Sequence, residues 1–360
     1  MGAAGSVGSA VVRAVAEYRP SALHLVDLSE NNLTEVVREL RSGDHDPPDD
    51  FAALPLCIGS TEFAKYLSAT PPHDYILVFS ALKHVRSEKD PYSLMRMYKT
   101  NVLYLKGILD HARTHGARRV FSVSSDKAVR PFNLMGATKT FMEKLLYACS
   151  AEVPFATARF ANVAFSDGSL PHGFHNRLLK RQPIAGPSDV KRYFISEREA
   201  AELCLLACFA GGNREAVYPK LTDSLPLVSF ADMARSFLEM EGLRALECAS
   251  EVEAKEAARR LGPGSRDWPC YFAPSETTGE KPAEEFYYPD DVRDETRFEA
   301  VGVVTDSSAW HTGDVWGAMS TLAAIEQTGT WEKEGIANAI RLAVPELIHQ
   351  ERFRSLDQRM

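Results

Sequence analysis

The sequence lacks the patterns that would place the protein in or across a membrane. Its 360 residues contain no apolar run long enough to span a bilayer and no secretory signal pattern. The six cysteines show no framework spacing and no Cys-x-x-Cys pair, which argues against a disulfide scaffold and for a reducing compartment. We therefore expect a cytoplasmic protein without membrane association.

Metal-binding clusters and an excess of basic charge are also missing. Cys204 and Cys208 stand four residues apart, as do His111 and His115, but buried thiols and a solvated helix face explain these pairs better than metal ligation. The 41 basic residues are outnumbered by 49 acidic ones, which argues against a nucleic-acid partner. With 45% apolar and 25% charged residues, the composition is typical of a soluble globular protein with a sizeable core.

A glycine-rich loop opens the chain and runs into a helical pattern. Glycines let a backbone approach a pyrophosphate, and a helix N-terminus offers N–H groups and the positive end of a dipole. We predict that this loop binds the phosphates of a dinucleotide through Gly2, Gly5, Ser6, Val7 and Gly8.

An acidic residue ends the next predicted strand, residues 22–27. Asp27 lies about 20 residues after the glycine loop, where a dinucleotide site places the carboxylate that hydrogen-bonds the adenosine ribose. Because a carboxylate repels a 2′-phosphate, Asp27 favours NAD over NADP. A capping role for Asp27 at the following helix remains the alternative.

The strand that should precede the glycine loop is missing from the sequence. In a dinucleotide-binding sheet that strand is central, so its loss leaves unpaired backbone groups on both neighbours. We expect that residues precede Met1 in the native protein.

Strand and helix patterns alternate over the middle of the chain. Strands are predicted over residues 75–80, 119–124 and 155–160, and helices over 98–115 and 137–150. This alternation predicts an α/β fold with a Rossmann-type doubly wound parallel sheet, followed by a smaller carboxyl-terminal substrate-binding lobe.

The same patterns suggest where the domains divide. We predict a dinucleotide-binding domain over residues 1–165, a substrate lobe over 166–330 that is interleaved with it, and a helical segment over 331–360. The helical stretch 335–353 could pack against a partner subunit, so we expect a homo-oligomer.

Reactive side chains gather at the end of the predicted strand 119–124. Ser125, Asp126 and Lys127 place a hydroxyl, a carboxylate and an amine where doubly wound folds bind their ligands. The alternative is a capping Asp126 beside a surface Lys127. On the helix that follows, Met135 and Lys139 are four residues apart and share one face.

Several segments together resemble a known family. They are residues 81–85 (ALKHV), 98–102 (YKTNV) and 124–139 (SSDKAVRPFNLMGATK), with support from 159–163 and 192–195. Over about residues 1–220, the chain is similar to the CapD-like polysaccharide-biosynthesis branch of the extended short-chain dehydrogenases/reductases. Met135 is typical of one subgroup, the 4,6-dehydratases that act on UDP-N-acetylglucosamine.

The resemblance implies an NAD-dependent nucleotide-sugar 4,6-dehydratase, a lyase that removes water. The related reductases have a proton-transferring tyrosine at the position of Met135. Their lysine, at the position of Lys139, lowers the pKa of that tyrosine. Methionine cannot transfer a proton. The implied reaction moves hydride from C4 to NAD and later to C6, while Lys127 removes the C5 proton and Asp126 protonates the departing C6 hydroxyl. Ser125, with Lys139, would relay the proton of the C4 hydroxyl.

The remaining candidate residues bind ligands. Lys83 and Lys139 are predicted at the cofactor. Asn162 and Arg192 suit the diphosphate or uridine of a UDP-sugar. A structural role for His84 remains the alternative. The predicted substrate-binding set is His84, Met135, Asn162, Ser169 and Arg192.

Two other functions stay open. A UDP-N-acetylhexosamine 4- or 5-epimerase also oxidises C4, although 4-epimerases usually keep the tyrosine. A non-catalytic nucleotide-sugar-binding protein is favoured by Met135 and the missing strand, and opposed by the intact Asp126, Lys127 and Lys139.

Overall fold

The chain folds into two compact units. The computed structural model describes residues 1–44, 46–221, 227–262, 264–275 and 284–348. Unit 1 comprises Met1–Phe160, Arg198–Lys220 and the described residues from Glu285 onward. Unit 2 comprises Ala161–Glu197 and the described residues between Leu221 and Glu284.

This division differs from the predicted domain boundaries at residues 165 and 330. The segments 198–220 and 285–330 lie in unit 1, to which they supply three strands and the helices α8 (Glu197–Leu205) and α11 (Val315–Glu326). The predicted helical segment 331–360 begins with a helix over Lys333–Ala343, and residues 349–360 lie outside the described chain.

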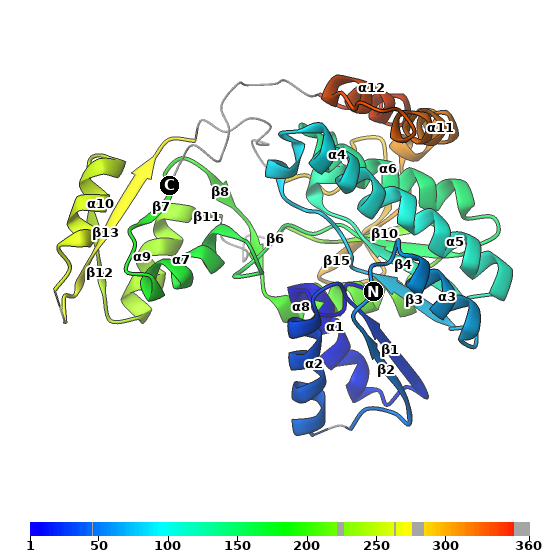
Figure 1. Ribbon diagram of the computed structural model, residues 1–360, viewed down its shortest axis with the longest axis horizontal. Coiled ribbons are helices and arrows are strands. Elements are labelled where there is room, and N and C mark those ends of the chain that lie inside the picture. The colour runs from blue at the N-terminus through cyan, green and yellow to red at the C-terminus, as the bar shows by residue number, and fades with distance from the viewer. Residues whose placement is uncertain (45, 222–226, 263, 276–283, 349–360) are drawn as a thin grey trace. The chain divides into compact units, whose positions relative to one another are not determined.

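A mostly parallel six-stranded sheet forms the centre of unit 1 (Figure 1). Its strands are β3 (Tyr75–Val78), β4 (Arg119–Val123), β5 (Phe155–Ala158), β10 (Glu215–Pro219), β14 (Val292–Asp294) and β15 (Val301–Asp306). The spatial order is β14-β15-β10-β5-β4-β3. β3, β4, β5 and β10 run parallel, and β15 and β14 add an antiparallel edge. The α/β prediction is confirmed. The mostly apolar sequences of the strands are typical of a sheet that is covered on both faces.

Helices cover this sheet on both faces, with α6 on one side and α8 on the other (Figure 1). The helices of unit 1 are α1 (Ser6–Glu17), α2 (Glu30–Ser42), α3 (Thr61–Ala69), α4 (Pro91–Tyr98), α5 (Tyr104–His115), α6 (Leu134–Cys149), α8 (Glu197–Leu205), α11 (Val315–Glu326) and α12 (Lys333–Ala343). A π-helical turn, Lys99–Leu103, joins α4 to α5. As predicted, the long helix ends at Gly116, whose φ of 76° is left-handed.

The central helix α6 is buried along most of its length. It packs against β5 and against α4, α5, α11 and α12. Contact on several sides explains why its polar residues Thr138, Lys139, Glu143 and Lys144 are buried along with the apolar ones. These side chains must find partners inside the protein.

The amino-terminal part of unit 1 forms a separate parallel pair of strands. The pair is β1 (Ala22–Val26) and β2 (Asp50–Leu54). Their core includes Leu25, Leu33 and Val36. Among the described residues no strand lies between β1 and β3. The β1–β2 pair is therefore a sheet separate from the six-stranded one.

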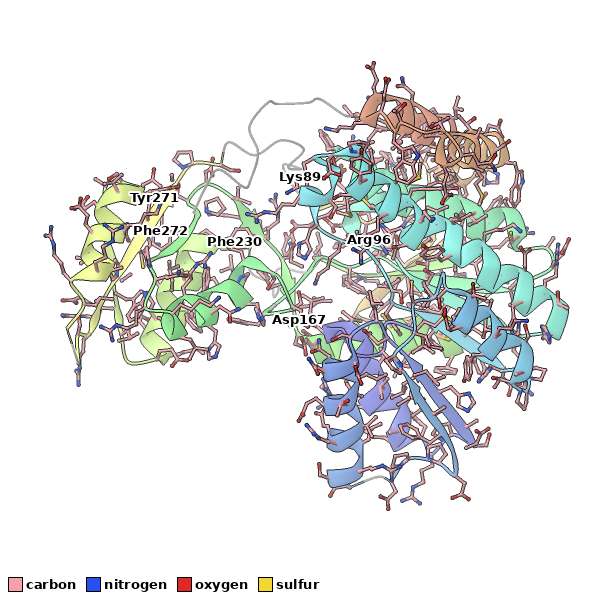
Figure 2. All side chains as sticks on the ribbon, viewed as in Figure 1. Lys89, Arg96, Asp167, Phe230, Tyr271 and Phe272 are labelled. Carbon is pink, nitrogen blue, oxygen red and sulfur yellow. The ribbon has the colours of Figure 1, made fainter. Side chains whose placement is uncertain are left out.

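Unit 2 contains a smaller parallel sheet in the order β12-β13-β7. Its elements are β6 (Asn162–Val163), α7 (Leu170–Leu179), β7 (Ile184–Pro187), β8 (Lys191–Arg192), β9 (Phe194–Ile195), β11 (Val228–Ser229), α9 (Phe230–Met240), β12 (Arg244–Glu247), α10 (Glu251–Arg259) and β13 (Asp267–Ala273). Phe174 and Trp268 lie in its core. Figure 2 labels three further aromatic residues of this unit, Phe230, Tyr271 and Phe272.

Among the described residues, no helix is both long enough and apolar enough to cross a membrane.

A buried ion pair ties α6 to β5. The guanidinium of Arg159 donates to both oxygens of Glu143, at 2.6 and 2.9 Å, and each side chain is 1% exposed. Ser124 Oγ donates to Oε1 of Glu143 at 2.5 Å, and Trp310 Nε1 donates to Oε2 at 3.0 Å. Burial raises the pKa of Glu143, but the Arg159 charge and these hydrogen bonds outweigh it, so the pKa is lowered overall.

Replacing Arg159 should destabilise the fold far more than breaking a surface pair. Arg159→Met leaves the Glu143 carboxylate buried without its cation, so we expect a loss of about 3–5 kcal/mol in the free energy of unfolding. Arg38→Met is the matched control, because the Arg38–Glu35 pair is 70% and 72% exposed, and it should cost less than about 1 kcal/mol. Urea denaturation measures both, and equal losses would contradict the structural role of the buried pair.

Candidate functional site

The glycine loop lies directly against the backbone of unit 1. A Cβ on Gly2, whose φ is +71°, would lie 2.4 Å from the backbone nitrogen of Ser80. A Cβ on Gly8 would lie 1.9 Å from the carbonyl oxygen of Gly2, so α1 packs on the loop without room for a side chain. At Gly5 the nearest atom is 3.8 Å away. Gly2 and Gly8 are therefore required by the fold, whereas Gly5 keeps open space.

The N-terminus of α1 has no side-chain cap. Its N-cap residue is Gly5, which carries no group that could accept from the first-turn amides. The first turn contains Ser6, Val7 and Gly8 and has no acidic residue. Together with the positive end of the helix dipole, this arrangement suits an anion such as a phosphate.

Asp27 lies directly after β1 and contacts the glycine loop. Its Oδ2 accepts from the backbone nitrogen of Ala4 at 2.9 Å, and its Oδ1 accepts from that of Ser29 at 2.8 Å. The N-cap of α2 is Ser29, whose side chain accepts from the amide of Asn32. Ser29, and not Asp27, is therefore the N-cap of α2. Asp27 connects the glycine loop with the N-terminus of α2.

The three reactive residues after β4 form one hydrogen-bonded cluster. Ser125 Oγ donates to Asp126 Oδ1 at 2.7 Å, and Lys127 Nζ donates to the same oxygen at 3.0 Å. The Asp126 side chain is 4% exposed and that of Lys127 is 33% exposed. Ser125, not Asp126, caps the short 3-10 turn Asp126–Ala128. A buried carboxylate therefore lies beside an amine that reaches the surface.

Helix α6 holds this turn in place by direct backbone packing. A Cβ on Gly136 would lie 2.3 Å from the carbonyl oxygen of Lys127. Thr140 Oγ1 donates to the carbonyl of Ala128 at 2.6 Å. The side chain of Asn133 caps α6 by accepting from the Gly136 amide at 2.7 Å. The position of the Lys127 backbone thus depends on Gly136, in the first turn of α6.

Lys139 and Met135 lie on the buried face of α6 near this turn. Lys139 Nζ donates to the carbonyl of Val123, the last residue of β4, at 2.9 Å. Burial lowers the pKa of Lys139 to about 8, and the nearby Glu143 carboxylate opposes that shift. Met135 is 3% exposed, and its amide donates to the buried carboxylate of Glu88 at 2.7 Å.

Two buried residues of this region escaped the sequence prediction. Asn101, in the π-helical turn, accepts from the amide of Leu82 at 2.8 Å and donates to Thr138 Oγ1 at 2.9 Å. It therefore connects the loop after β3 with α6. Asn101 lies inside the motif 98–102, which could have pointed to it, whereas no sequence signal marks Glu88.

Lys83 and His84 follow β3 on the same loop and are exposed. His84 precedes a 3-10 turn over Val85–Glu88 and gives it no side-chain cap. The pKa of His84 is lowered, first by partial desolvation and next by the cations Lys83 and Arg86. His84 is therefore held toward the neutral imidazole.

The predicted substrate residues of unit 2 converge in part. Asn162 Nδ2 donates to Oε1 of Glu284 at 3.1 Å, and Arg192 Nε lies 3.7 Å from the same oxygen. Glu284, with a side chain that is 1% exposed, was not predicted. Ser169 lies elsewhere in the unit and caps α7 by accepting from the amide of His172. Its substrate role remains a prediction.

Unit 1 thus gathers most of the predicted site. The glycine loop and Asp27 contact each other, and Ser125, Asp126 and Lys127 form one cluster against α6. In the part of the chain that the structure describes, no group of three or more His, Cys, Asp or Glu side chains could hold a metal ion.

Comparison with known proteins places this arrangement in a family. A family model described as "Polysaccharide biosynthesis protein" matches residues 1–305. The chain belongs to this family. The resemblance read from the sequence motifs is confirmed at the level of the family and its CapD-like relatives. The role of Met135 in place of a tyrosine stays a prediction.

Named relatives support the family at low identity. The chain is 28% identical over 269 residues to a Methanocaldococcus jannaschii protein named as uncharacterized membrane protein, covering 72% of this chain and 76% of that protein. It is 27% identical over 192 residues to a Campylobacter jejuni UDP-N-acetylglucosamine 4,6-dehydratase (inverting), covering 50% and 55%. This chain spans 40% and 43% of the length of two other relatives named for polysaccharide biosynthesis.

A solved structure shares the fold. The Pen protein from Bacillus thuringiensis superposes with a TM-score of 0.68 at 22% identity, covering 86% of each chain. The Rossmann-type assignment is confirmed by this likeness and by the parallel sheet.

The buried Lys139 should make the stability of the protein depend on pH in the alkaline range. Its pKa is about 8 in the folded state against 10.5 for the ordinary side chain, so between these values the unfolded chain binds more protons. The free energy of unfolding should therefore rise as the pH increases from about 8 to about 10.5, and the lysine contributes no slope below about 8. Lys139→Met should remove this contribution, as the difference between urea titrations of the two proteins will show. Parallel pH curves would mean that Lys139 keeps its ordinary pKa.

Proposed function

We propose that the chain is an NAD-dependent nucleotide-sugar 4,6-dehydratase that acts on UDP-N-acetylglucosamine. The observation that carries the proposal is the Ser125–Asp126–Lys127 cluster at the end of β4, beside a helix whose Met135 cannot transfer a proton. The relative from Campylobacter jejuni named as a UDP-N-acetylglucosamine 4,6-dehydratase supports the choice of substrate.

The residues of the glycine loop fit a dinucleotide. Gly5 leaves open space in front of the uncapped N-terminus of α1, where a pyrophosphate would lie. Asp27 follows β1 beside the loop, where its carboxylate would accept from ribose hydroxyls and disfavour a 2′-phosphate. Lys83 and Lys139 are proposed to contact the nicotinamide half. When bound, NAD supplies hydride transfer from C4 of the hexose and back to C6.

The acid and base steps fall to Asp126 and Lys127. The two share one hydrogen bond of 3.0 Å, so a proton can pass between the ammonium and the carboxylate. The proposed roles use the neutral form of the pair, with Lys127 as amine and Asp126 as acid. Lys127 then accepts the C5 proton and Asp126 donates to the C6 hydroxyl.

The oxidation step needs a group that takes the proton of the C4 hydroxyl. Ser125 Oγ is hydrogen-bonded to Asp126, the proposed acid. Lys139 is buried on the adjacent helix α6, and its pKa is lowered. We assign the proton relay to these two residues. We propose that Met135, predicted to bind substrate, makes an apolar contact with the sugar.

Unit 2 is proposed to bind the UDP part. Arg192 offers a cation and Asn162 an amide near the buried Glu284, and charge-assisted contacts from arginine suit a diphosphate. His84 and Ser169 complete the proposed substrate set.

Mass spectrometry of the sugar product tests the function. We expect UDP-N-acetylglucosamine, incubated with the protein and NAD, to lose one water. An isomer of unchanged mass would overturn the dehydratase in favour of an epimerase. An unaltered sugar in the presence of bound NAD would contradict both enzymes and favour a binding protein.

Removing the proposed base should stop elimination without releasing the cofactor. Lys127→Ala should lower the dehydration rate by at least about 100-fold, since a positioned acid or base contributes on that scale. NAD binding, followed by protein fluorescence, should be unchanged. Lys106→Ala is the matched control, because Lys106 pairs with Asp110 on α5 away from the cluster, and it should keep full activity. Loss of NAD binding in Lys127→Ala would instead assign Lys127 a structural role.

Alanine in the glycine loop should separate binding from folding. Gly5→Ala fills the open space, so we expect NAD affinity to fall by about tenfold or more while the melting temperature holds. Gly8→Ala should lower the melting temperature, because its Cβ meets the Gly2 carbonyl. Gly107→Ala is the control, with no atom within 4 Å of its Cβ, and should leave NAD binding intact. Equal NAD affinity in Gly5→Ala and the parent protein would refute the proposed phosphate position.

A further inference from the structure

A histidine on β1 lies at the centre of a small polar cluster in unit 1. His24 Nε2 lies 2.8 Å from Oδ1 of Asp50, the first residue of β2. On the other side of the ring, His24 Nδ1 lies 2.5 Å from Oη of Tyr66 on α3 and 2.9 Å from Nε2 of His73, in the loop between α3 and β3. Only 9% of the His24 side chain is exposed. None of these four residues has a part in the proposed dehydratase.

Two side chains share a single nitrogen of His24. An imidazole nitrogen carries either one proton or one lone pair, so Nδ1 offers one position for a hydrogen-bond partner. Tyr66 Oη and His73 Nε2 both lie on that side of the ring, within 2.9 Å of Nδ1. Hydrogen bonds would use one lone pair of His24 twice, whereas a cation among the three atoms would use a lone pair of each.

The surroundings of His24 match those of a metal-binding histidine. Such a histidine usually donates its other ring N–H to a carboxylate, which fixes its tautomer and orientation. Asp50 has that position, because its carboxylate lies at Nε2 while Nδ1 faces Tyr66 and His73. Burial, followed by the neighbouring His24, lowers the pKa of His73 and so favours its neutral imidazole. Neutral imidazole is the form that binds a metal.

The distances require small movements before an ion fits. Zn–N bonds of about 2.0–2.1 Å place two ligands of a tetrahedral zinc ion about 3.3 Å apart. The two histidine nitrogens, at 2.9 Å, would separate by a few tenths of an ångström, and the Tyr66 oxygen would withdraw from Nδ1 by about 0.8 Å.

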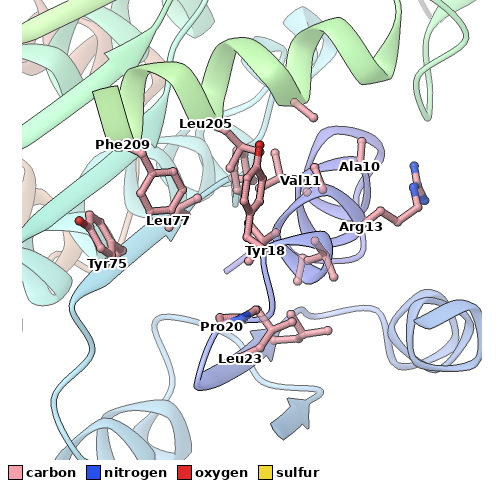
Figure 3. Close-up of a pocket in the computed structure, with 18 of the residues that line it drawn as sticks. Ala10, Val11, Arg13, Tyr18, Pro20, Leu23, Tyr75, Leu77, Leu205 and Phe209 are labelled. Carbon is pink, nitrogen blue, oxygen red and sulfur yellow. The ribbon is translucent and has the colours of Figure 1, made fainter. Parts of the chain in front are cut away.

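A cavity beside the histidines gives them space for this movement. Its volume is about 1180 Å³, and both His24 and His73 belong to its lining. Much of the remaining wall is apolar, as Leu23, Leu77 and Leu205 in Figure 3 show. The two rings are therefore not close-packed on every side, and an ion can reach them from the cavity.

We propose that His24 Nδ1, His73 Nε2 and Tyr66 Oη bind a zinc ion, with Asp50 orienting His24 and a water molecule as the fourth ligand. Two imidazoles and an oxygen suit zinc, which takes nitrogen and oxygen ligands in tetrahedral geometry. The set joins two histidines to a tyrosine, so it is not one of the clusters of three His, Cys, Asp or Glu considered above. The ion would connect β1, α3 and the loop that leads into β3, and would hold the two-stranded sheet to the six-stranded one.

Zinc titration of the untagged protein, after dialysis against EDTA, tests the proposal. Competition with a chromophoric chelator should show one zinc ion per chain, with a Kd of about 1 µM or tighter. Tyr66→Phe, which removes only the ligand oxygen, and His73→Ala should each weaken binding by at least about tenfold. Asp50→Asn should weaken it by about tenfold through the orientation of His24. Zinc should raise the melting temperature of the parent protein by at least about 2 °C, and that of His73→Ala by less.

A second histidine pair supplies the matched control. His111 and His115 are one turn apart on α5, with their rings stacked at 4.0 Å, and such a pair can bind zinc on its own. The double variant His111→Ala/His115→Ala should keep the affinity of the parent protein. Binding that is lost in this variant and retained in His73→Ala and Tyr66→Phe would overturn the proposal. So would the absence of zinc binding by the parent protein, or a melting temperature that zinc leaves unchanged.

Discussion

The ion pair between Glu143 and Arg159 is the contact on which the reactive end of the sheet depends. It joins the middle of α6 to the residue that follows β5. Both side chains are buried, so neither charge is solvated by water. Ser124 is bonded to the same carboxylate, so the residue just before the reactive cluster is held by a group that has no catalytic part. The same carboxylate also opposes the fall in the pKa of Lys139. One buried acid thus positions the backbone of the site and influences its electrostatics.

The second constraint is steric. At Gly136 the backbone of α6 lies so near the carbonyl of Lys127 that no side chain fits between them. Beside this contact the Asp126 side chain is buried, while the Lys127 side chain reaches the surface. Backbone-to-backbone contact of this kind fixes the distance between helix and turn more tightly than side-chain packing would. The proposed roles of Asp126 and Lys127, which are joined by one hydrogen bond, would need that precision.

Much of unit 1 was predictable because its signals are local. The glycine loop, Asp27 and the cluster Ser125–Lys127 each follow a strand or open a helix, and such positions show in the sequence as patterns of spacing. The division of the chain was less predictable. Residues 198–220 and 285–330 return to the first sheet, and that return depends on pairing between β10, β15 and β5, which are far apart in sequence.

Single buried partners were the hardest to foresee. Glu88 and Glu284 become important only because the fold brings a distant amide or cation to them, and nothing in their neighbourhood in the sequence marks them. The sequence also did not indicate that Ser169 caps α7, and its predicted contact with substrate stays a prediction. Local polarity alone does not distinguish a cap from a binding group.

The π-helical turn at Lys99–Leu103 has a consequence for comparing related sequences. Such a turn holds one residue more than an α-helix of equal rise, and here that residue lets Asn101 reach both Leu82 and Thr138. Removing one residue would restore a regular α-helical turn, whereas a shift of one residue along a helix corresponds to a rotation of about 100° around its axis. An alignment that closes a one-residue gap at this point would therefore match the wrong faces of two helices while appearing continuous.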